Sequence, residues 1–481
     1  MQEGRTTKAL IWKLLERFGV QGVQFILQII LARLLSPEHY GVLSIMIIFT
    51  SLANVFIQMG FNTALIQNKD VTEEDYSSVL WVTLGIAGIL YGVIFFATPL
   101  IAQFYAMPEL IWPLRVLALM LFPGALNSVQ LAKVSREMDF KKVFYSNIGA
   151  IIIAGGVGIV IALLGGGLWA LVAQTMLNIF VAAVVMLFTA RIKIRFKVDF
   201  KRIKILFKFG WKLLVSGLID TLYQDIQGLV IGKKYDSATL GFYNRGKQFP
   251  QFLMNSINSA VQSVMLPAMS EKQDDRSQLK GMMRNSIMLS AYVVFPLMAG
   301  LAGVAEPLVR VLLTDKWLPC VPYLQIYCFS FAFYPVHSCN LQAINAIGRS
   351  DLFLKLEIIK KSYGLFALII AVVFFESPIA IAMTAVITGM LGFFVNAAPN
   401  KKLIGYSYFE QVRDILPSFL ASIIMCAAVL ALGVFDLNVF VTLIIQVFVG
   451  VIVYFLISVI FKLKPFLMVV ELLKNLNNKT K

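Results

Sequence analysis

Charged residues are scarce in this chain. Only 14% of its 481 residues are charged, whereas soluble domains carry about 25%. Hydrophobic residues make up 59% of the chain, and the mean hydropathy is +0.80. A soluble fold has too little interior to hide that much apolar surface. The composition therefore excludes an ordinary soluble protein and indicates a membrane protein.

Residues that build metal sites and disulfide frameworks are equally sparse. The two histidines, His39 and His337, stand alone, and the four cysteines match neither a metal-ligand spacing nor a disulfide pattern. We therefore expect the cysteines to pack as small apolar residues, and we expect no metal site and no cofactor.

Long apolar runs fill most of the sequence. Each is about 20 residues or more, which is enough to cross a hydrocarbon core of roughly 30 Å as a helix. The runs are too long for barrel strands, so we expect an all-α integral membrane protein with about fourteen transmembrane helices. The expected spans are 8–35, 40–68, 77–104, 109–134, 143–164, 166–190, 207–232, 238–268, 283–314, 319–347, 352–375, 377–398, 412–434 and 437–461.

The net charge of +16 has a membrane explanation. Most of the 42 lysine and arginine residues fall in alternate connections and in the tails, while the other connections hold only Lys233, Lys234 and Lys316. Such asymmetry follows the positive-inside rule, and it predicts that both termini are cytoplasmic. Membrane lipids are therefore the expected partner of the basic charge, and nucleic acid is not. The first apolar run lacks a small-residue cleavage site, so we expect it to stay in the protein.

An internal repeat recurs after about 200 residues. The sequence of Trp12–Leu15 returns at Trp211–Leu214, and Gln28 and Gly41 match Gln227 and Gly241. Six spans separate the copies, so both should enter the membrane in the same direction and form two pseudo-symmetric six-helix lobes. The expected division is an N-terminal lobe (1–190), a basic cytoplasmic connector (191–206), a C-terminal lobe (207–400) and two extra helices with a basic tail (401–481).

Polar residues form stripes on four repeat-related spans. At roughly 100° per residue, the amides of the span near 238–268 fall within about 40° of one line. Polar groups are costly in a bilayer, so such stripes indicate the walls of a hydrated cavity. Amides that simply hold helices together are the alternative. The candidate substrate-binding residues are Arg17, Gln21, Gln24, Gln28, Asn54, Gln58, Asn62, Gln224, Gln227, Asn244, Arg245, Lys247, Gln248, Gln251, Asn255 and Asn258.

The charges near these stripes suggest the chemistry of the substrate. Arginine and lysine suit a diphosphate, and asparagine and glutamine suit sugar hydroxyls because amides both donate and accept hydrogen bonds. Glu16, Asp220 and Asp225 are candidates for ion coupling, to a proton or to sodium; structural ion pairs with the basic residues are the alternative. Charged residues in spans without a stripe are predicted to pair or to reach the headgroups: Arg115, Glu306, Arg310, Glu357, Lys360 and Lys361.

Two stretches of sequence resemble a known family. The first is Leu31–Pro37 with Tyr40-Gly41, and the second is Gly241–Pro250, reading GFYNRGKQFP. Both are similar to the polysaccharide transporter branch of the flippase superfamily that also contains multidrug and toxic-compound extruders. The second stretch resembles that of Wzx-type exporters of colanic and teichuronic acid. Family cavity residues carry over by motif only at 244–250. Arg17 resembles a cavity arginine of the lipid II flippase branch by helix position alone.

The resemblance implies a pair of lobes, alternating access, and export of an undecaprenyl-diphosphate-linked oligosaccharide across the bacterial inner membrane. It also suggests a polysaccharide polymerase and glycosyltransferases as partners. A drug or organic-cation antiporter of the same fold is the first alternative, although the balanced charges among amides favour a large polar anion. A membrane enzyme such as a sugar polymerase ranks last, because the outer connections are short and offer few acid, base or metal groups.

Overall fold

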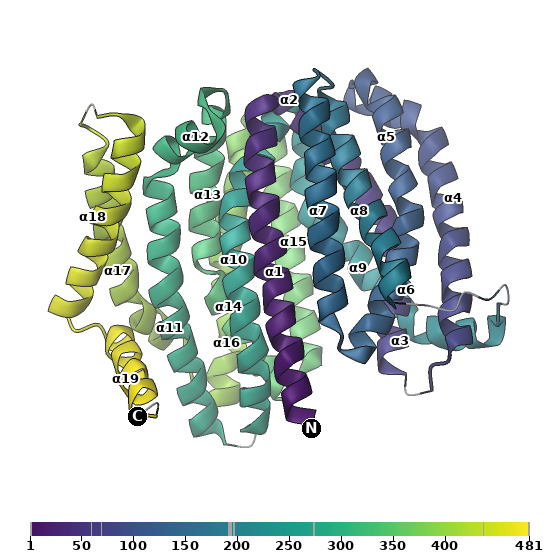
Figure 1. The fold of residues 1–481 in the computed structure, drawn as a ribbon. Coiled ribbons are helices and arrows are strands. Elements are labelled where there is room, and N and C mark those ends of the chain that lie inside the picture. The colour runs from purple at the N-terminus through teal and green to yellow at the C-terminus, as the bar shows by residue number, and fades with distance from the viewer. Residues whose placement is uncertain are drawn as a thin grey trace. The chain divides into compact units, whose positions relative to one another are not determined.

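The computed structural model describes residues 2–58, 60–68, 70–190, 195, 198–272, 275–435 and 437–479. All regular secondary structure in these ranges is helical (Figure 1). Contacts divide the chain into two compact units, Met1–Gly241 and Phe242–Lys481. The expected division at 191–206 and at 400/401 stays a prediction.

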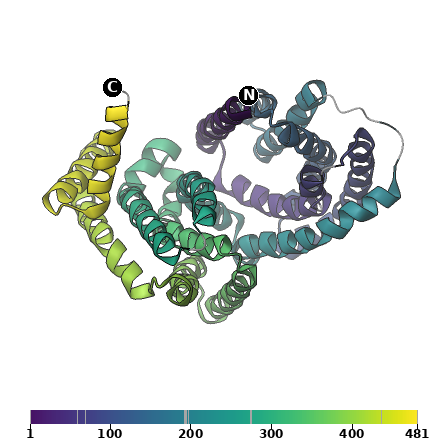
Figure 2. The same cartoon turned by 90° about the horizontal axis from the view of Figure 1, so that it is seen from below.

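The first unit contains nine α-helices and two short 3₁₀ turns. The α-helices are α1 (Gln2–Leu34), α2 (Pro37–Gln58), α3 (Phe61–Gln67), α4 (Glu73–Tyr105), α5 (Ile111–Leu117), α6 (Leu121–Glu137), α7 (Phe140–Leu163), α8 (Leu168–Ala190) and α9 (Phe200–Lys234). The 3₁₀ turns, at Pro108–Leu110 and Ala118–Met120, join α4, α5 and α6. In Figure 2, α1 is seen close to its axis and α9 runs at an angle to it.

The second unit begins inside α10 (Ser237–Glu271). The helices that follow are α11 (Arg276–Gly303), α12 (Ala305–Leu313), α13 (Val321–Ala332), α14 (Tyr334–Ala346), α15 (Ser350–Phe374), α16 (Pro378–Ile404), α17 (Tyr408–Leu432), α18 (Val439–Ile460) and α19 (Lys464–Lys479). A 3₁₀ turn at Asp315–Cys320 joins α12 to α13.

Nine helical segments of the described ranges are long and apolar enough to cross a membrane. They are Pro37–Gln67, Glu73–Tyr105, Pro108–Glu137, Phe140–Leu163, Leu168–Ala190, Arg276–Gly303, Pro378–Ile404, Tyr408–Leu432 and Val439–Ile460. Together with the helical fold, they confirm an all-α membrane protein. The exact number of fourteen stays a prediction.

Four predicted spans are not single α-helices. The spans predicted at 109–134 and 283–314 are divided at Ala118–Met120 and at Val304. The span predicted at 40–68 ends as α2 at Gln58 and resumes as the separate helix α3 at Phe61. The span predicted at 319–347 is broken at Phe333, which is followed by Tyr334 and Pro335 at the start of α14. Proline lacks the backbone N–H that a continuous helix would use, so a break is expected there.

Burial follows the pattern expected of a protein in lipid. Inside the first unit, Phe61, Leu65 and Leu80 pack together from α3 and α4. Large apolar side chains also cover the outside, where Phe96 and Phe188 are 78% and 75% exposed. Water would disfavour such a surface, whereas hydrocarbon tolerates it.

Candidate functional site

The α1 stripe is described only in its second half. Gln21, Gln24 and Gln28 are half-buried, and Gln21 and Gln28 interact with other residues. The side chains of Glu16 and Arg17 lie outside the described residues. The structure therefore leaves the predicted roles of Glu16 and Arg17 as predictions.

The stripe predicted on the span at 40–68 lies on two separate helices, α2 and α3. Asn54 is half-buried on α2 and faces α6, and Gln58 is exposed at the end of α2. The break puts Asn62 on α3, so the assumption of one continuous helix through Asn62 is wrong. The side-chain oxygen of Asn62 is buried and has no hydrogen-bond partner among the described residues.

The α9 stripe lies on an accessible surface. Asp220 and Gln224 are exposed, while Asp225 and Gln227 are half-buried. Asp220, Asp225 and Gln227 all interact with other residues. Asp220 is thus reachable by an ion and also engaged by the protein, which suits a group that exchanges partners.

The α10 stripe is mostly half-buried. Asn255 is exposed, and the other stripe amides are half-buried: Asn244, Gln248, Gln251 and Asn258. The Oδ1 atom of Asn258 is buried without a hydrogen-bond partner in the described part of the chain. Because a lone buried amide oxygen is unfavourable, Asn258 and Asn62 are places where water or a polar ligand would be held.

Arg245 differs from its neighbours on α10. Its side chain is 5% exposed, and its Nη1 donates to Oε1 of Gln248 at 2.7 Å. The guanidinium carbon lies 5.2 Å from the centroid of the Trp317 ring. These contacts favour a structural role for Arg245, and its role in substrate binding stays a prediction.

Lys247 stands over two tyrosines. Its Nζ lies 5.9 Å from the ring centroid of Tyr243 and 5.7 Å from that of Tyr327, and the two phenol oxygens are 2.7 Å apart in a buried hydrogen bond. Lys247 itself is half-buried. The aromatic rings hold an ammonium group beside the polar stripe, where it can meet an anion. Sequence reasoning missed both tyrosines, although Tyr243 directly precedes the predicted stripe.

A buried network of amides in the second unit was also missed. Asn340 of α14 and Gln411 of α17 exchange two hydrogen bonds, at 2.9 and 3.0 Å. Nδ2 of Asn400 on α16 donates to Oδ1 of Asn340 at 2.7 Å. All three side chains are completely buried. Their isolation in apolar helices was visible in the sequence, but the pairing required the packing of three helices.

Pairing was predicted correctly for several charged residues away from the stripes. Arg310 pairs with Glu306 at 3.0 Å, and Lys360 pairs with Glu357. Arg115 lies over the ring of Phe95, 4.1 Å from its centroid, and donates to the Phe95 carbonyl oxygen. Lys361 also interacts with other residues.

An apolar cavity of about 370 Å³ opens among α11, α13 and α17. Phe295, Phe329, Phe419 and Cys426 are among its lining residues, and it contains none of the predicted stripe residues. Its lining suits hydrocarbon and not a sugar. Within the described ranges, no group of three or more His, Cys, Asp and Glu side chains could hold a metal ion.

Curated proteins named for polysaccharide biosynthesis are similar to this chain. The succinoglycan biosynthesis transport protein ExoT of Rhizobium meliloti (strain 1021) is 26% identical over 71% of this chain and 69% of its own length. The teichuronic acid biosynthesis protein TuaB of Bacillus subtilis (strain 168) is 26% identical over 63% of each chain. The lipopolysaccharide biosynthesis protein WzxC of Escherichia coli (strain K12) is 20% identical over 89% of this chain and 88% of its own.

Solved structures show the same fold. The lipid II flippase MurJ, in an inward closed conformation, aligns over 95% of this chain and 98% of its own, with a TM-score of 0.76 and 16% identity. An inward-facing multidrug resistance transporter of the MATE family, from the MOP superfamily, aligns over 82% of this chain and 98% of its own, with a TM-score of 0.61 and 17% identity. Both likenesses concern the fold alone.

A family match covers more than half of the sequence. The family described as "Polysaccharide biosynthesis protein" matches residues 30–322, which include α2 to α12 and both stretches of sequence that first suggested a transporter. The chain therefore belongs to the polysaccharide biosynthesis protein family.

Proposed function

We propose that this protein is a flippase that moves an undecaprenyl-diphosphate-linked oligosaccharide across the bacterial inner membrane by alternating access. The observation that carries the proposal is the set of amide stripes on α1, α2, α9 and α10 in a chain of the polysaccharide biosynthesis family. The MurJ-like fold and the relatives named for polysaccharide biosynthesis and transport support it. The protein acts as a transporter and not as an enzyme.

The stripes address the main physical obstacle to this transport. A diphosphate and its sugars would lose their hydration in hydrocarbon, at a free-energy cost of many kcal/mol. Half-buried amides such as Gln251 and Asn258 can replace water around hydroxyl groups, and Lys247 can balance phosphate charge. The polyprenyl chain stays in lipid throughout, so only the polar headgroup needs a polar path.

Direction requires a source of free energy. Proton or sodium countertransport through Asp220 or Asp225 is one source, and Asp220 is the more exposed of the two. Removal of the product by a polymerase outside the membrane is the other. Either source of free energy is compatible with a substrate that glycosyltransferases make on the cytoplasmic side.

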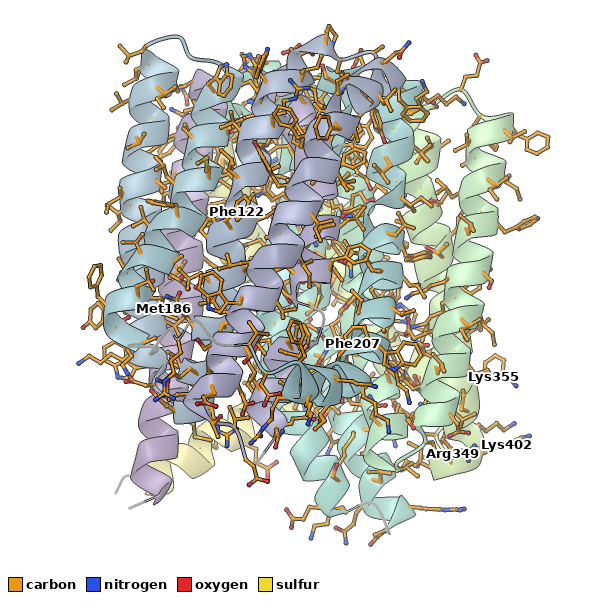
Figure 3. All side chains as sticks on the ribbon, turned by 90° about the vertical axis from the view of Figure 1, so that its right-hand side faces the viewer. Phe122, Met186, Phe207, Arg349, Lys355 and Lys402 are labelled. Carbon is orange, nitrogen blue, oxygen red and sulfur yellow. The ribbon has the colours of Figure 1, made fainter. Side chains whose placement is uncertain are left out.

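Sidedness follows from the basic residues. Figure 3 shows Arg349, Lys355 and Lys402 at one end of α15 and α16, as expected for two antiparallel helices joined at the opposite end. By the positive-inside rule we assign this end to the cytoplasm. The same rule assigns both termini to the cytoplasm.

The proposal is tested in cells that depend on this protein for polymer export. Replacing Lys247 by alanine should cause lipid-linked precursor to accumulate in the inner leaflet and should reduce exported polymer. Lys355→Ala is the matched control, since Lys355 is exposed at the end of α15. Normal export by the Lys247→Ala protein would contradict a role of Lys247 at the headgroup. Drug sensitivity with unchanged polymer export after gene deletion would instead favour the antiporter alternative.

A further inference from the structure

Four lysines follow one face at the start of α9. Lys201, Lys204, Lys208 and Lys212 are separated by three, four and four residues, so at roughly 100° per residue they fall within about 80° of one another. All four side chains are exposed. They extend along ~16 Å of helix, at about 1.5 Å per residue. We call this set the lysine ladder.

The ladder has no counter-charge among the described residues. Neighbouring arginines are already paired: Arg202 with Asp75 at 3.4 Å, and Arg195 with Glu74 at 2.9 Å. None of the four ladder ammonium groups makes an ion pair in the described ranges. Glu73, the third acidic residue in the first turn of α4, pairs with Lys133 at 2.8 Å. These carboxylates thus have other partners, and the lysines present an uncompensated positive surface.

Exposed apolar residues flank and continue the ladder. Phe200, Ile205 and Trp211 are 73%, 63% and 45% exposed. Beyond Lys212 the same side of α9 turns apolar, with Val215 and Ile219 44% and 52% exposed. A basic face that changes to an apolar one, with a tryptophan at the change, is typical of a helix that crosses from headgroups into hydrocarbon.

Two described residues before the ladder, Arg195 and Asp199, are hydrogen-bonded to α4. The carbonyl oxygen of Arg195 accepts hydrogen bonds from Ser77 at 2.7 Å and from the Trp81 indole at 2.9 Å. Asp199 caps α9 by accepting from the backbone N–H groups of residues 201 and 202, and its own N–H donates to Ser78 at 3.0 Å. The lysines are therefore held in place rather than carried on a loose loop.

We propose that the lysine ladder is a binding site for the phosphates of anionic phospholipids in the leaflet where α9 begins. Four uncompensated ammonium groups match several lipid phosphates, because basic residues near an anionic membrane surface are attracted to its headgroups. The flanking apolar side chains enter the acyl region beside the same lipids. The site is separate from the amide stripes and does not depend on the proposed transport activity.

The test measures lipid binding and not transport. The melting temperature of the purified protein is followed while phosphatidylglycerol or phosphatidylcholine is added to the detergent. Phosphatidylglycerol should raise the melting temperature of the wild type, and replacing all four ladder lysines by glutamine should remove most of this rise. The control replaces four other exposed lysines by glutamine and should retain most of it: Lys355, Lys401, Lys402 and Lys464.

The outcomes separate specific binding from general charge. An equal loss in the control, or an unchanged rise in the ladder variant, would overturn the proposal. If a short polyprenyl diphosphate gave the larger rise and the ladder variant lost it, the site would belong to the transported lipid and the phospholipid assignment would be wrong. Melting in phosphatidylcholine shows whether the ladder variant is folded. If it is not, the double variant Lys208→Gln/Lys212→Gln is measured in its place, with half of the loss expected.

Discussion

Gly41 of α2 and Gly241 of α10 pack against each other at repeat-equivalent positions. A β-carbon on Gly241 would collide with the carbonyl oxygen of Pro37 and lie 3.4 Å from the backbone nitrogen of Gly41. A β-carbon on Gly41 would collide with the carbonyl oxygen of Ser237. The contact is reciprocal, since each glycine meets the first residue of the other helix. The two repeat-related glycines thus allow the first turns of α2 and α10 to approach each other closely.

Alanine at either glycine should destabilise the protein. The obstructing atoms belong to the backbone, so the helices must separate, and overpacking of this kind typically costs ~1–3 kcal/mol. We expect a lower melting temperature for Gly41→Ala and for Gly241→Ala. Gly85→Ala is the control, because nothing lies within 4 Å of its would-be β-carbon. Equal melting of all three variants would show that the close approach is unimportant.

Arg245 and Lys247 should separate stability from transport. Arg245 is buried beside Trp317, and lysine lacks the planar group that stacks there, so Arg245→Lys should lower stability by about 1 kcal/mol. Lys247→Ala should leave the melting temperature nearly unchanged and reduce transport. Thermal melting and polymer export of both variants check this. Wild-type stability of Arg245→Lys together with lost transport would instead make Arg245 a substrate contact.

Asn340 should support two other buried amides. In Asn340→Leu, Gln411 and Asn400 lose the side-chain oxygen to which they donate, and an unsatisfied buried amide costs ~1–3 kcal/mol. The melting temperature should fall. Replacing Asn340, Asn400 and Gln411 together by leucine should recover part of the loss, since no partner is then left unpaired. A triple variant less stable than the single one would mean that the three amides have a further role.

Asp275, which caps α11 outside the predicted spans, should make the stability of the protein depend on pH in the acidic range. Backbone N–H groups of Gln278 and Ser277 hold the pKa of its carboxyl below the usual value. A lowered folded pKa means that the stabilisation is complete above the unfolded pKa, near 3.9, and is lost as the pH falls through the folded pKa. Asp275→Asn keeps a cap without titration. Between pH 6 and pH 3 the melting temperature should therefore fall more for the wild type than for the variant. Parallel falls in the two proteins would contradict a stabilising role for the Asp275 carboxylate.

Periodicity and composition predict which segments are helical and which helix faces are polar, because both depend on neighbouring residues. The break at Gly60, which has a φ of 68°, was missed because a single glycine is a weak signal beside a long apolar run. The burial of Arg245 was missed for another reason: a helical angle tells which face a residue occupies, but not that Trp317, far along the chain, covers that face. The Asn340 network likewise depends on the packing of three helices.

We propose that this protein moves a lipid-linked oligosaccharide headgroup between leaflets. The most direct measurement reconstitutes purified protein in liposomes with an undecaprenyl-diphosphate-linked oligosaccharide and follows its access to a membrane-impermeant sugar-modifying enzyme. We predict that substrate reaches the opposite leaflet, and that Lys247→Ala slows this at least about tenfold, which corresponds to ~1.4 kcal/mol. Equal rates in liposomes with and without active protein would contradict the account.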